Sequence, residues 1–434
     1  MSFRGKIWVL VLSGAIAMYA VIGGLPIVGS LLTTQAQQPV NDPGAQLRIV
    51  ESVLQHIQND YVDEPNMEKV RVGALRGLAS GLDPYSSYLT PEQVKEFQAG
   101  GFAGKAGIGA ELSQVAGYVY IISAPKGSPA DKAGIKSGDV IEYIDGKATR
   151  DISLYDARQL LAGDAGSTVS LRVLRSGEKP QTIKVTRGTF KAPTAESRIE
   201  GGKIGIIKVN SLDSGEAADI RSQLLSLTKQ GAQKIILDLR GVAGGTLEEG
   251  AAVANLFIKD GELAKVVGRE GKVTRTVTAD PSKAAFDGEM AVLTSLGTAG
   301  AAEVVAAAVV ERKRGEVIGE RTFGSGTDQK LFTMSSGGGY LLTVAKWASP
   351  GGTPFFGEDR NSMGVKPSIE VKRPDTPEPL DVEDLVDQQT KDGQNPQATP
   401  TPTPKAKPVV TEDIQLKKAL EVLGEKPAAS KAVG

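Results

Sequence analysis

The fold is decided by residues 234–245, which read Lys-Ile-Ile-Leu-Asp-Leu-Arg-Gly-Val-Ala-Gly-Gly. The apolar run Ile235-Ile236-Leu237 suits a strand buried on both faces, which is typical of a parallel sheet covered by helices. The same alternation of strand and helix continues on either side of this run. We predict strands at 204–209, 234–239, 291–294 and 317–318, helices at 215–229, 247–258 and 301–312, and a hairpin with strands at 329–334 and 340–345.

The length and composition narrow the class of protein. At roughly 150 residues per domain, 434 residues suggest about three domains. The 50 basic and 51 acidic residues give a net charge of -1, which excludes a strongly basic nucleic-acid-binding protein. The absence of cysteine excludes disulfides, thiol nucleophiles and cysteine-ligated metals. The single histidine, His56, falls on a predicted helix, where a surface role is more common than catalysis. No metal or cofactor site is predicted.

The N-terminus carries an export signal. Arg4 and Lys6 precede an apolar run from residue 7 to residue 32. This run is longer than the core of a cleaved signal peptide and long enough to span a membrane. We predict a signal anchor at 1–36, with a signal peptide cleaved near Ala36 as the alternative. Either prediction places the body in the periplasm or another extracytoplasmic space, and the anchor would attach it to the inner membrane.

Residues 45–100 form a predicted helical module. Apolar residues recur at helical spacing in two stretches, 47–61 and 67–82. Thr90 then reads as the N-cap of a short helix, with Gln93 placed to complete a capping box.

The C-terminal region, residues 374–434, has a different composition. Residues 396–408 are rich in threonine and proline, which suits an extended, disordered spacer. A last helix is predicted at 411–423, with Thr411 as its cap and Gly424 just past its end.

Between the module and the core, residues 101–188 are rich in glycine at their start and in strand-forming residues afterwards. Strands are predicted at 118–122, 140–144, 168–174 and 182–186. One helix fits 153–161, with Ser153 as its N-cap. This content in a short region indicates a small, partly open β-barrel.

A carboxylate-binding loop is predicted at Gly107-Ile108-Gly109-Ala110. Consecutive N–H groups without bulky side chains can bind a peptide's C-terminal carboxylate, while the following strand edge pairs with the peptide backbone. Alone, such a stretch is as readily a simple turn. Here it is followed by Gly-Ser-Pro-Ala at 127–130, Ala-Gly-Ile-Lys-Ser-Gly-Asp-Val-Ile at 133–141 and Ile-Asp-Gly at 144–146. Together these segments closely resemble a PDZ domain, which implies a ligand strand between the strand after Gly109 and the helix at 153–161.

Four further segments resemble the carboxyl-terminal processing peptidases, also called tail-specific proteases. They are Asp-Pro-Tyr-Ser-Ser-Tyr-Leu-Thr at 83–90, Asp-Leu-Arg-Gly-Val-Ala-Gly-Gly at 238–245, Gly-Glu-Arg-Thr-Phe-Gly-Ser-Gly at 319–326 and Gly-Val-Lys-Pro at 364–367. The family patterns for the second and third are D-L-R-N-N-P-G-G and G-E-R-T-F-G-K-G. The resemblance covers roughly residues 45–375 and the last helix. It implies an α+β multidomain protein with a helical module (45–100), a PDZ domain (101–188), a peptidase-like α/β core (189–373) and a tail with a terminal helix (374–434).

The resemblance also implies which residues would carry the chemistry. The family uses a serine nucleophile, within S-A-S-A-S-E, and a lysine general base. Aligning Glu303 with the glutamate of that pattern places Gly300 at the nucleophile position, and Ser325 stands where the family has lysine. Both catalytic side chains are therefore absent. Three flanking features remain, namely the accessory glutamine at Gln329 and oxyanion-site amides at Gly244 or Gly245 and at Ala301.

Three functions stay open on this sequence. The leading hypothesis is a pseudo-peptidase that binds C-terminal tails of proteins and regulates or scaffolds an active relative. The second is an active endopeptidase with Ser295 or Thr298 as a displaced nucleophile and Lys330 as the base, although both hydroxyls suit helix-entry capping. The third is a purely structural protein of the cell envelope. Because family members often assemble through N-terminal helices and the C-terminal tail, the resemblance also implies a homodimer.

Overall fold

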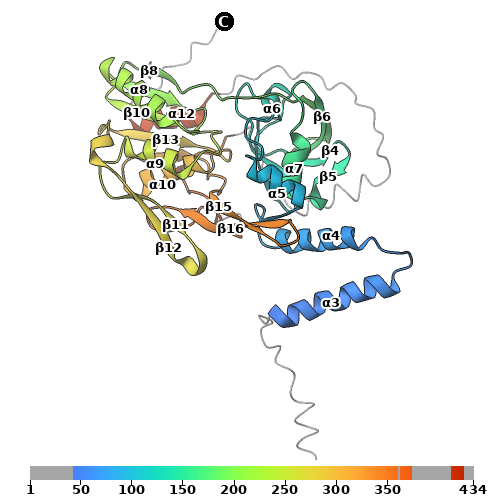
Figure 1. Cartoon of the computed structure of the whole chain (residues 1–434). Helices are drawn as coiled ribbons and strands as arrows, with labels where there is room; N and C mark the ends of the chain where they lie inside the picture. Colours follow the sequence, from blue (N-terminus) through green and yellow to red (C-terminus); the bar gives the residue numbers. More distant parts are fainter. Residues whose placement is uncertain (1–42, 360–361, 374–411, 425–434) are drawn as a thin grey trace, which may run out of the picture. The chain divides into compact units, whose positions relative to one another are not determined.

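The computed structural model describes residues 43–359, 362–373 and 412–424 (Figure 1). The chain divides into two compact units, and the boundary in the sequence lies between Gly73 and Ala74. The predicted anchor at 1–36 and the spacer at 396–408 lie outside the described residues. Within the described ranges, no helix is long and apolar enough to cross a membrane.

The first unit contains helix α3 (Pro43–Asp60) and the start of helix α4 (Met67–Ser80). His56 lies on α3, and its Nδ1 is 2.6 Å from Oδ2 of Asp60, one helical turn later. Both side chains are exposed. The histidine is therefore a surface residue, which agrees with the prediction.

Strand β1 (Ser87–Leu89) and helix α5 (Pro91–Gln98) follow α4 in the second unit. Thr90 caps α5 through the predicted box, since its side chain accepts from the Gln93 amide and the Gln93 side chain accepts from the Thr90 amide. Gln93 also donates to Oδ1 of Asp156 at 2.7 Å, which joins the helical segment to the domain that follows.

That domain is a sheet with the strand order β2-β3-β4-β6-β7 and two helices against it. Its elements are β2 (Glu111–Val115), β3 (Tyr118–Ser123), α6 (Pro129–Lys132), β4 (Val140–Ile144), β5 (Lys147–Ala148, beside β4), α7 (Leu154–Leu161), β6 (Thr168–Leu174) and β7 (Gln181–Thr186). Ser153 caps α7 as predicted, because its side chain accepts from the Asp156 amide. Strand β2 lies at the edge of this path, so one of its sides is open to a further strand.

The core is built on a sheet with the strand order β17-β14-β13-β10-β9-β8. Only β8 runs antiparallel to its neighbour among these described strands. The strands are β8 (Glu196–Glu200), β9 (Ile204–Lys208), β10 (Lys234–Asp238), β13 (Met290–Thr294), β14 (Glu316–Gly319) and β17 (Ile369–Glu370). Ile235, Ile236 and Leu237 of β10 are all fully buried, as their continuous apolar run predicts.

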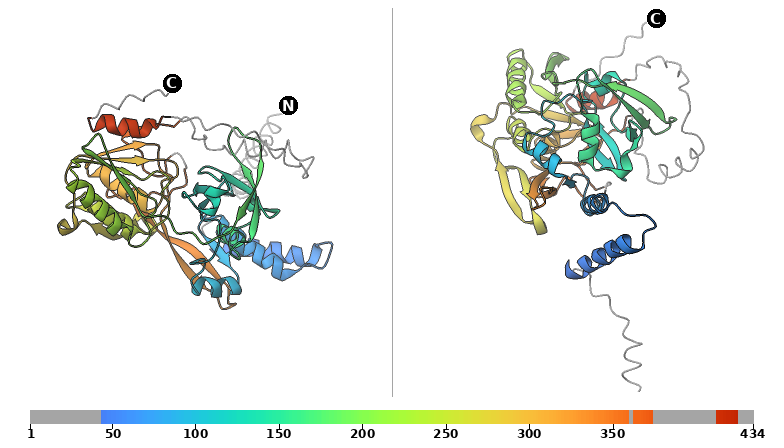
Figure 2. Two further views of the ribbon diagram at one scale, coloured as in Figure 1. Left: turned by 90° about the horizontal axis from the view of Figure 1, so that it is seen from above. Right: turned by 45° about the vertical axis from the view of Figure 1, so that its right-hand side comes forward.

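Helices cover both faces of this sheet (Figures 1 and 2). Residues of α8 (Glu216–Lys229), α9 (Leu247–Asn255) and α10 (Ala301–Glu311) pack on the face that contains Ile235 and Leu237. Helix α12 (Ile414–Val422) packs on the face that contains Ile236. Because side chains alternate along a strand, these two sets of contacts lie on opposite sides.

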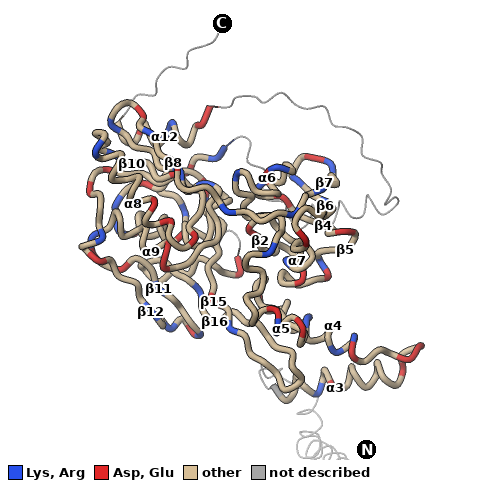
Figure 3. The backbone as a smooth tube through the Cα atoms, turned by 45° about the horizontal axis from the view of Figure 1, so that its top comes forward, with Lys and Arg blue, Asp and Glu red and all other residues tan. Residues whose placement is uncertain are grey.

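A second sheet in the core has the order β1-β16-β11-β12, with β15 also paired to β16. Its remaining strands are β11 (Glu262–Val267), β12 (Val273–Thr278), β15 (Thr327–Thr333) and β16 (Gly339–Ala348). The predicted hairpin is therefore present with longer strands. Basic and acidic residues are both spread over the two domains of the second unit (Figure 3).

Two predicted helix ends differ from the structure. Helix α9 ends at Asn255 rather than at residue 258. Helix α12 begins at Ile414 and is capped by Asp413, whose carboxylate accepts from the Leu416 amide. The predicted cap, Thr411, lies outside the described residues.

Gly250 sets how closely α9 approaches the start of α10. A Cβ at this position would overlap the carbonyl of Ala301. We expect Gly250→Ala to lower the free energy of unfolding by about 1–3 kcal/mol, because the two helices would have to separate. Thermal or urea unfolding followed by circular dichroism measures the effect. The control is Gly77→Ala in α4, where a Cβ would meet nothing within 4 Å. Equal losses in both variants would contradict the packing argument.

Candidate functional site

The centre of the candidate site is the buried carboxylate of Glu303, in the first turn of α10. Its Oε2 accepts from the amides of Gly300 at 2.9 Å and Ser325 at 2.8 Å. Its Oε1 accepts from the Gly324 amide at 2.7 Å and from the Thr322 hydroxyl. One carboxylate thus brings the predicted nucleophile position and the predicted lysine position together.

The electrostatics of Glu303 reflect its burial. Removal from water raises the pKa of Glu303 to about 7, and the hydrogen bonds from Ser325, Thr322, Gly300 and Gly324 oppose that rise. An ionised carboxylate inside a protein needs such donors, because an unpaired buried charge is strongly unfavourable. The four donors therefore tie the start of α10 to the segment 322–325.

Gly300 has a backbone conformation that glycine adopts most easily, with φ 62° and ψ -118°. A Cβ at this position would lie 2.8 Å from the carbonyl oxygen of Gly244. The space that a nucleophile side chain would need is thus next to a backbone oxygen. No side chain is present there to attack a carbonyl group.

The predicted oxyanion site is not formed at Ala301. The Ala301 amide donates to the carbonyl oxygen of Gly244 at 3.0 Å. The first amides of a helix have no partner within the helix, so this one takes the nearest acceptor. Gly244 and Gly245 both have positive φ angles, 83° and 79°. In this arrangement Gly244 offers a carbonyl oxygen, not an N–H group, to the start of α10.

Gln329 lies on β15 with an exposed side chain. Its amide nitrogen donates to the hydroxyls of Thr327, at 2.6 Å, and Thr343, at 3.4 Å. It borders a cavity of about 390 Å³ together with Tyr85 and Arg158. Its hydrogen bonds therefore do not orient a base at residue 325.

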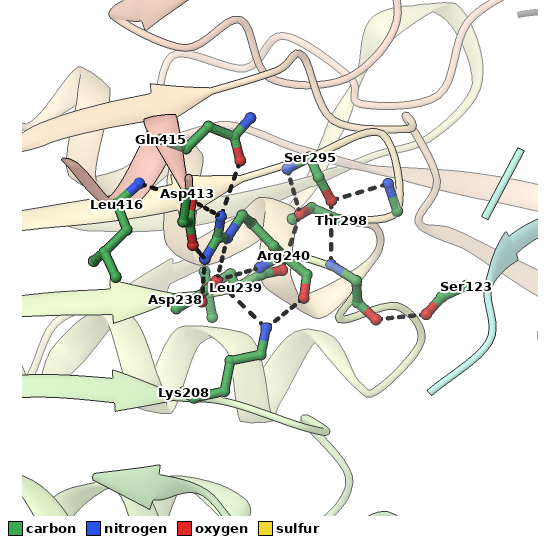
Figure 4. A network of polar contacts seen from close by, with 12 residues as sticks. Ser123, Lys208, Asp238, Leu239, Arg240, Ser295, Thr298, Asp413, Gln415 and Leu416 are labelled. Atoms are coloured by element: carbon green, nitrogen blue, oxygen red, sulfur yellow. Dashed lines mark hydrogen bonds and ion pairs between the residues drawn. The ribbon is translucent and has the colours of Figure 1, made fainter. Parts of the chain in front are cut away.

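The displaced nucleophiles considered from the sequence are both engaged with the backbone (Figure 4). The Thr298 hydroxyl donates to the Leu239 carbonyl at 2.9 Å and accepts from the Ser295 amide at 3.0 Å. The Ser295 hydroxyl accepts from the amides of Gly241, at 3.2 Å, and Gly297, at 3.3 Å. These contacts shape the loop before α10, but the N-cap of that helix is Gly300, so the helix-entry capping expected of the two hydroxyls is not what the structure shows.

The displaced base is exposed. Lys330 lies with its Nζ 5.4 Å from the centre of the Phe332 ring, and both side chains are open to solvent. A lysine acts as a general base only when burial or a nearby cation lowers its pKa. The structure gives Lys330 no such burial.

Sequence reasoning missed Lys208, at the end of β9. Burial lowers the pKa of Lys208, and the nearby Asp238 carboxylate opposes this shift. Its Nζ donates to the Arg240 carbonyl at 2.7 Å and lies 3.4 Å from Oδ1 of Asp238 (Figure 4). The signal in the sequence was a lysine that directly ends an apolar strand. Its Nζ contacts a carbonyl and a carboxylate, so Lys208 supports the loop after β10.

The loop predicted to bind a carboxylate, residues 107–110, differs from the prediction at one amide. The Gly107 amide donates to the Gly188 carbonyl at 3.1 Å, so it does not take part in the predicted nest. In the described chain, no backbone hydrogen bond engages the amides of Ile108 and Gly109. The loop borders a groove of about 210 Å³ whose apolar lining comes from Phe102, Ala106, Ile108, Ala110, Leu112, Leu161 and Ala162.

Arg158 on α7 borders the same groove. Its Nη2 is 2.9 Å from Oε1 of Glu111, the first residue of β2. A Cβ on Gly244 would lie 3.4 Å from Oε2 of Glu111. The start of β2, beside the groove, is therefore close to residues 240–245 of the core, which we call the glycine loop. The ring of Tyr120 also stacks on Phe323, with 5.4 Å between centroids. The two domains of this unit therefore meet at the candidate site.

A PDZ-like domain joined to an α/β core, with residues 300 and 325 brought together at Glu303, is the arrangement expected of the tail-processing peptidases. The comparisons agree: residues 203–371 match Peptidase family S41, and residues 120–175 match the PDZ domain family. The chain is 35% identical over 322 residues to the carboxy-terminal processing protease CtpA of Bacillus subtilis (strain 168), covering 74% of this chain and 68% of that protein. It is therefore a member of the carboxyl-terminal processing peptidase family S41.

Two further relatives support this membership. A "Probable CtpA-like serine protease" of Staphylococcus aureus (strain MRSA252) is 32% identical over 371 residues, which cover 85% of this chain and 73% of that protein. Among solved structures, the photosystem II D1 C-terminal processing protease superposes with a TM-score of 0.63 at 27% identity. That match covers 75% of this chain and 93% of the other.

Glu303 makes folding stability depend on pH. Its pKa is raised in the folded protein, to about 7 from 4.5, so its contribution to stability falls as pH rises through that interval. The full effect is on the order of 3 kcal/mol. We expect the melting temperature of the unchanged protein to fall relative to that of Glu303→Gln between pH 5 and pH 8, because glutamine does not titrate. Calorimetry across this range measures the difference.

The matched control is Glu64→Gln, which removes an exposed carboxylate. The plot of its melting temperature against pH should run parallel to that of the unchanged protein. A Glu303→Gln curve that also runs parallel would contradict the assignment.

Proposed function

We propose that this chain is an exported S41 family member that binds the C-terminal tails of proteins but does not hydrolyse them. One observation carries the proposal. Gly300 and Ser325 meet at Glu303, at the two positions where the family pattern has the serine nucleophile and the lysine base.

Losing both groups removes the covalent route. Glycine has no atom that can attack a carbonyl carbon, and a serine hydroxyl cannot replace a neutral amine as the base. Serine peptidases that lose their nucleophile retain only binding and whatever oxyanion stabilisation remains. Here the Ala301 amide also donates a hydrogen bond to the Gly244 carbonyl, so it contributes less to oxyanion stabilisation.

The binding half of the site is supported by the PDZ-like groove. Two observations support this: among the described residues no backbone hydrogen bond engages the Ile108 and Gly109 amides, and β2 is an edge strand that could pair with an extended peptide. The apolar lining of the groove favours a tail that ends in an apolar residue. The partners we propose are therefore C-terminal tails, with regulation or scaffolding of an active relative as the role, and a homodimer as the assembly.

The location proposed for this activity rests on the sequence alone. The basic residues Arg4 and Lys6 and the apolar run after them support export and anchoring to the inner membrane. The binding surfaces would then act on extracytoplasmic proteins.

Peptide hydrolysis is the second candidate, and the names of the relatives favour it, since they are proteases. It would need a hydroxyl and a buried amine from elsewhere. Ser295 and Thr298 hold the backbone, and Lys330 is exposed. These contacts favour the first proposal.

A peptidase assay tests the loss of hydrolysis. We expect the unchanged protein to release no fragments from labelled casein above a protein-free blank. The double variant Gly300→Ser/Ser325→Lys should gain measurable cleavage if the Gly244 carbonyl moves away from the new side chain. Turnover by the unchanged protein that Thr298→Ala abolishes would instead establish the displaced nucleophile.

A binding assay tests the groove. A fluorescein-labelled decapeptide with an apolar last residue should bind, and amidation of its carboxyl group should weaken binding at least about tenfold, because charge-assisted hydrogen bonds are lost. Gly109→Ala should also weaken binding, since its Cβ would press on Ser128 and Pro129 at 3.1 Å. Gly134→Ala is the control, because it also has positive φ but open space around it. Equal affinity for the peptide with a free carboxyl group and for the amidated peptide would contradict tail binding and would favour the structural role in the cell envelope.

A further inference from the structure

The glycine loop between β10 and α9 is held in place by its backbone oxygens. The Arg240 oxygen accepts from Lys208, and the Gly241 oxygen accepts from the hydroxyl of Ser123 in β3. The carbonyl oxygens of Val242 and Gly244 accept from the amides of Ala299 and Ala301, at 2.9 and 3.0 Å. Different parts of the fold thus fix successive peptide groups, and the last of them faces Gly300.

The side chain at the start of this loop is held by the C-terminal helix (Figure 4). Arg240 donates to Oδ1 and Oδ2 of Asp413 at 2.8 Å each, and to Oε1 of Gln415 at 3.2 Å. It also forms two hydrogen bonds to Asp238, at 2.9 and 2.8 Å. The Arg240 side chain is 15% exposed and the Asp413 side chain 41% exposed, so the guanidinium is mostly buried while its partner on α12 is partly in water. Two-pronged pairs of this type are strong and fix orientation as well as distance.

Helix α12 has few other polar anchors among the described residues. Gln415 donates to the Val371 carbonyl at 2.8 Å, and Lys234 donates to the Leu423 carbonyl at 2.8 Å. Its apolar contacts come from Ala419, Leu420 and Leu423. The helix is separated from the rest of the core by residues 374–411, so it reaches the sheet as a separate segment. Its polar contact with the glycine loop is the pair between Asp413 and Arg240, the first residue of that loop.

We propose that α12 positions the glycine loop of the candidate site through the Asp413–Arg240 pair, so that release of the helix loosens residues 240–245. This positioning of the loop does not depend on whether the site hydrolyses peptides. Without the Asp413 carboxylate, the guanidinium keeps only Asp238 as an ionic partner, two residues away in the same segment. The contact of Arg240 with α12 is then reduced to the hydrogen bond to Oε1 of Gln415, at 3.2 Å. Asp413 is thus a positioning residue for Gly244 and Gly245.

Asp413→Asn in the full chain tests this proposal. Asparagine can still cap α12 by accepting from the Leu416 amide, so the change removes the charge and spares the cap. Hydrogen–deuterium exchange read by mass spectrometry should become about tenfold faster both in 412–424 and in 240–246. The control is Glu412→Gln, because Glu412 pairs with Lys417 on the surface. It should change neither segment.

Two further variants separate positioning from simple loss of packing. Asp413→Glu retains a carboxylate and should restore most of the protection in both segments. Ser123→Ala should loosen 240–246 alone, because it removes the bond to Gly241 and leaves α12 docked. Faster exchange in 412–424 with unchanged exchange in 240–246 would overturn the proposal, as would unchanged exchange in both. Binding of the labelled decapeptide to the groove is a separate readout, so failure of tail binding would not be mistaken for failure of this coupling.

Discussion

The organisation of the site depends on one buried carboxylate. Glu303 has no access to water, and four donors from two separate segments converge on it. An unsatisfied carboxylate at this place would cost several kcal/mol, so the segments must stay together for the core to fold. As a result Gly300 and Ser325 remain neighbours although neither carries a catalytic group. Three of the four donors are backbone amides and the fourth is the Thr322 hydroxyl, so this contact needs no side chain from residue 300 or 325.

This separation of scaffold from chemistry explains how a peptidase fold can persist without its reacting groups. The contacts that shape the loop before α10 come from Ser295 and Thr298, and those that shape the glycine loop come from backbone amides and Lys208. None of them requires a nucleophile or a base. The tail binding proposed for this protein is likewise assigned to another part of the chain, the PDZ-like groove. The proposed loss of hydrolysis would therefore leave both the fold and that groove intact.

The glycine loop is also where distant parts of the chain meet. Ser123 reaches it from the PDZ-like domain, and Asp413 reaches it through Arg240 from the C-terminal helix. The same helix covers the second face of the core sheet, so its docking combines apolar burial with an ionic contact. A change at either contact acts on a loop that has little freedom elsewhere. A ligand in the PDZ-like groove, or displacement of α12, would therefore act on the glycine loop.

The sequence by itself determined the features that depend on near neighbours. The caps at Thr90 and Ser153 follow from residues three positions apart, and the buried strand at 235–237 follows from its apolar run. That Gly300 stands at a nucleophile position could be expected only through resemblance to a family, and so could the meeting of positions 300 and 325. The tertiary structure alone decided which amides were already occupied, such as those of Gly107 and Ala301, and that Asp413 would hold Arg240. The physical reason is that a donor takes whichever acceptor the packed chain brings nearest, and local sequence does not specify acceptors that lie far along the chain.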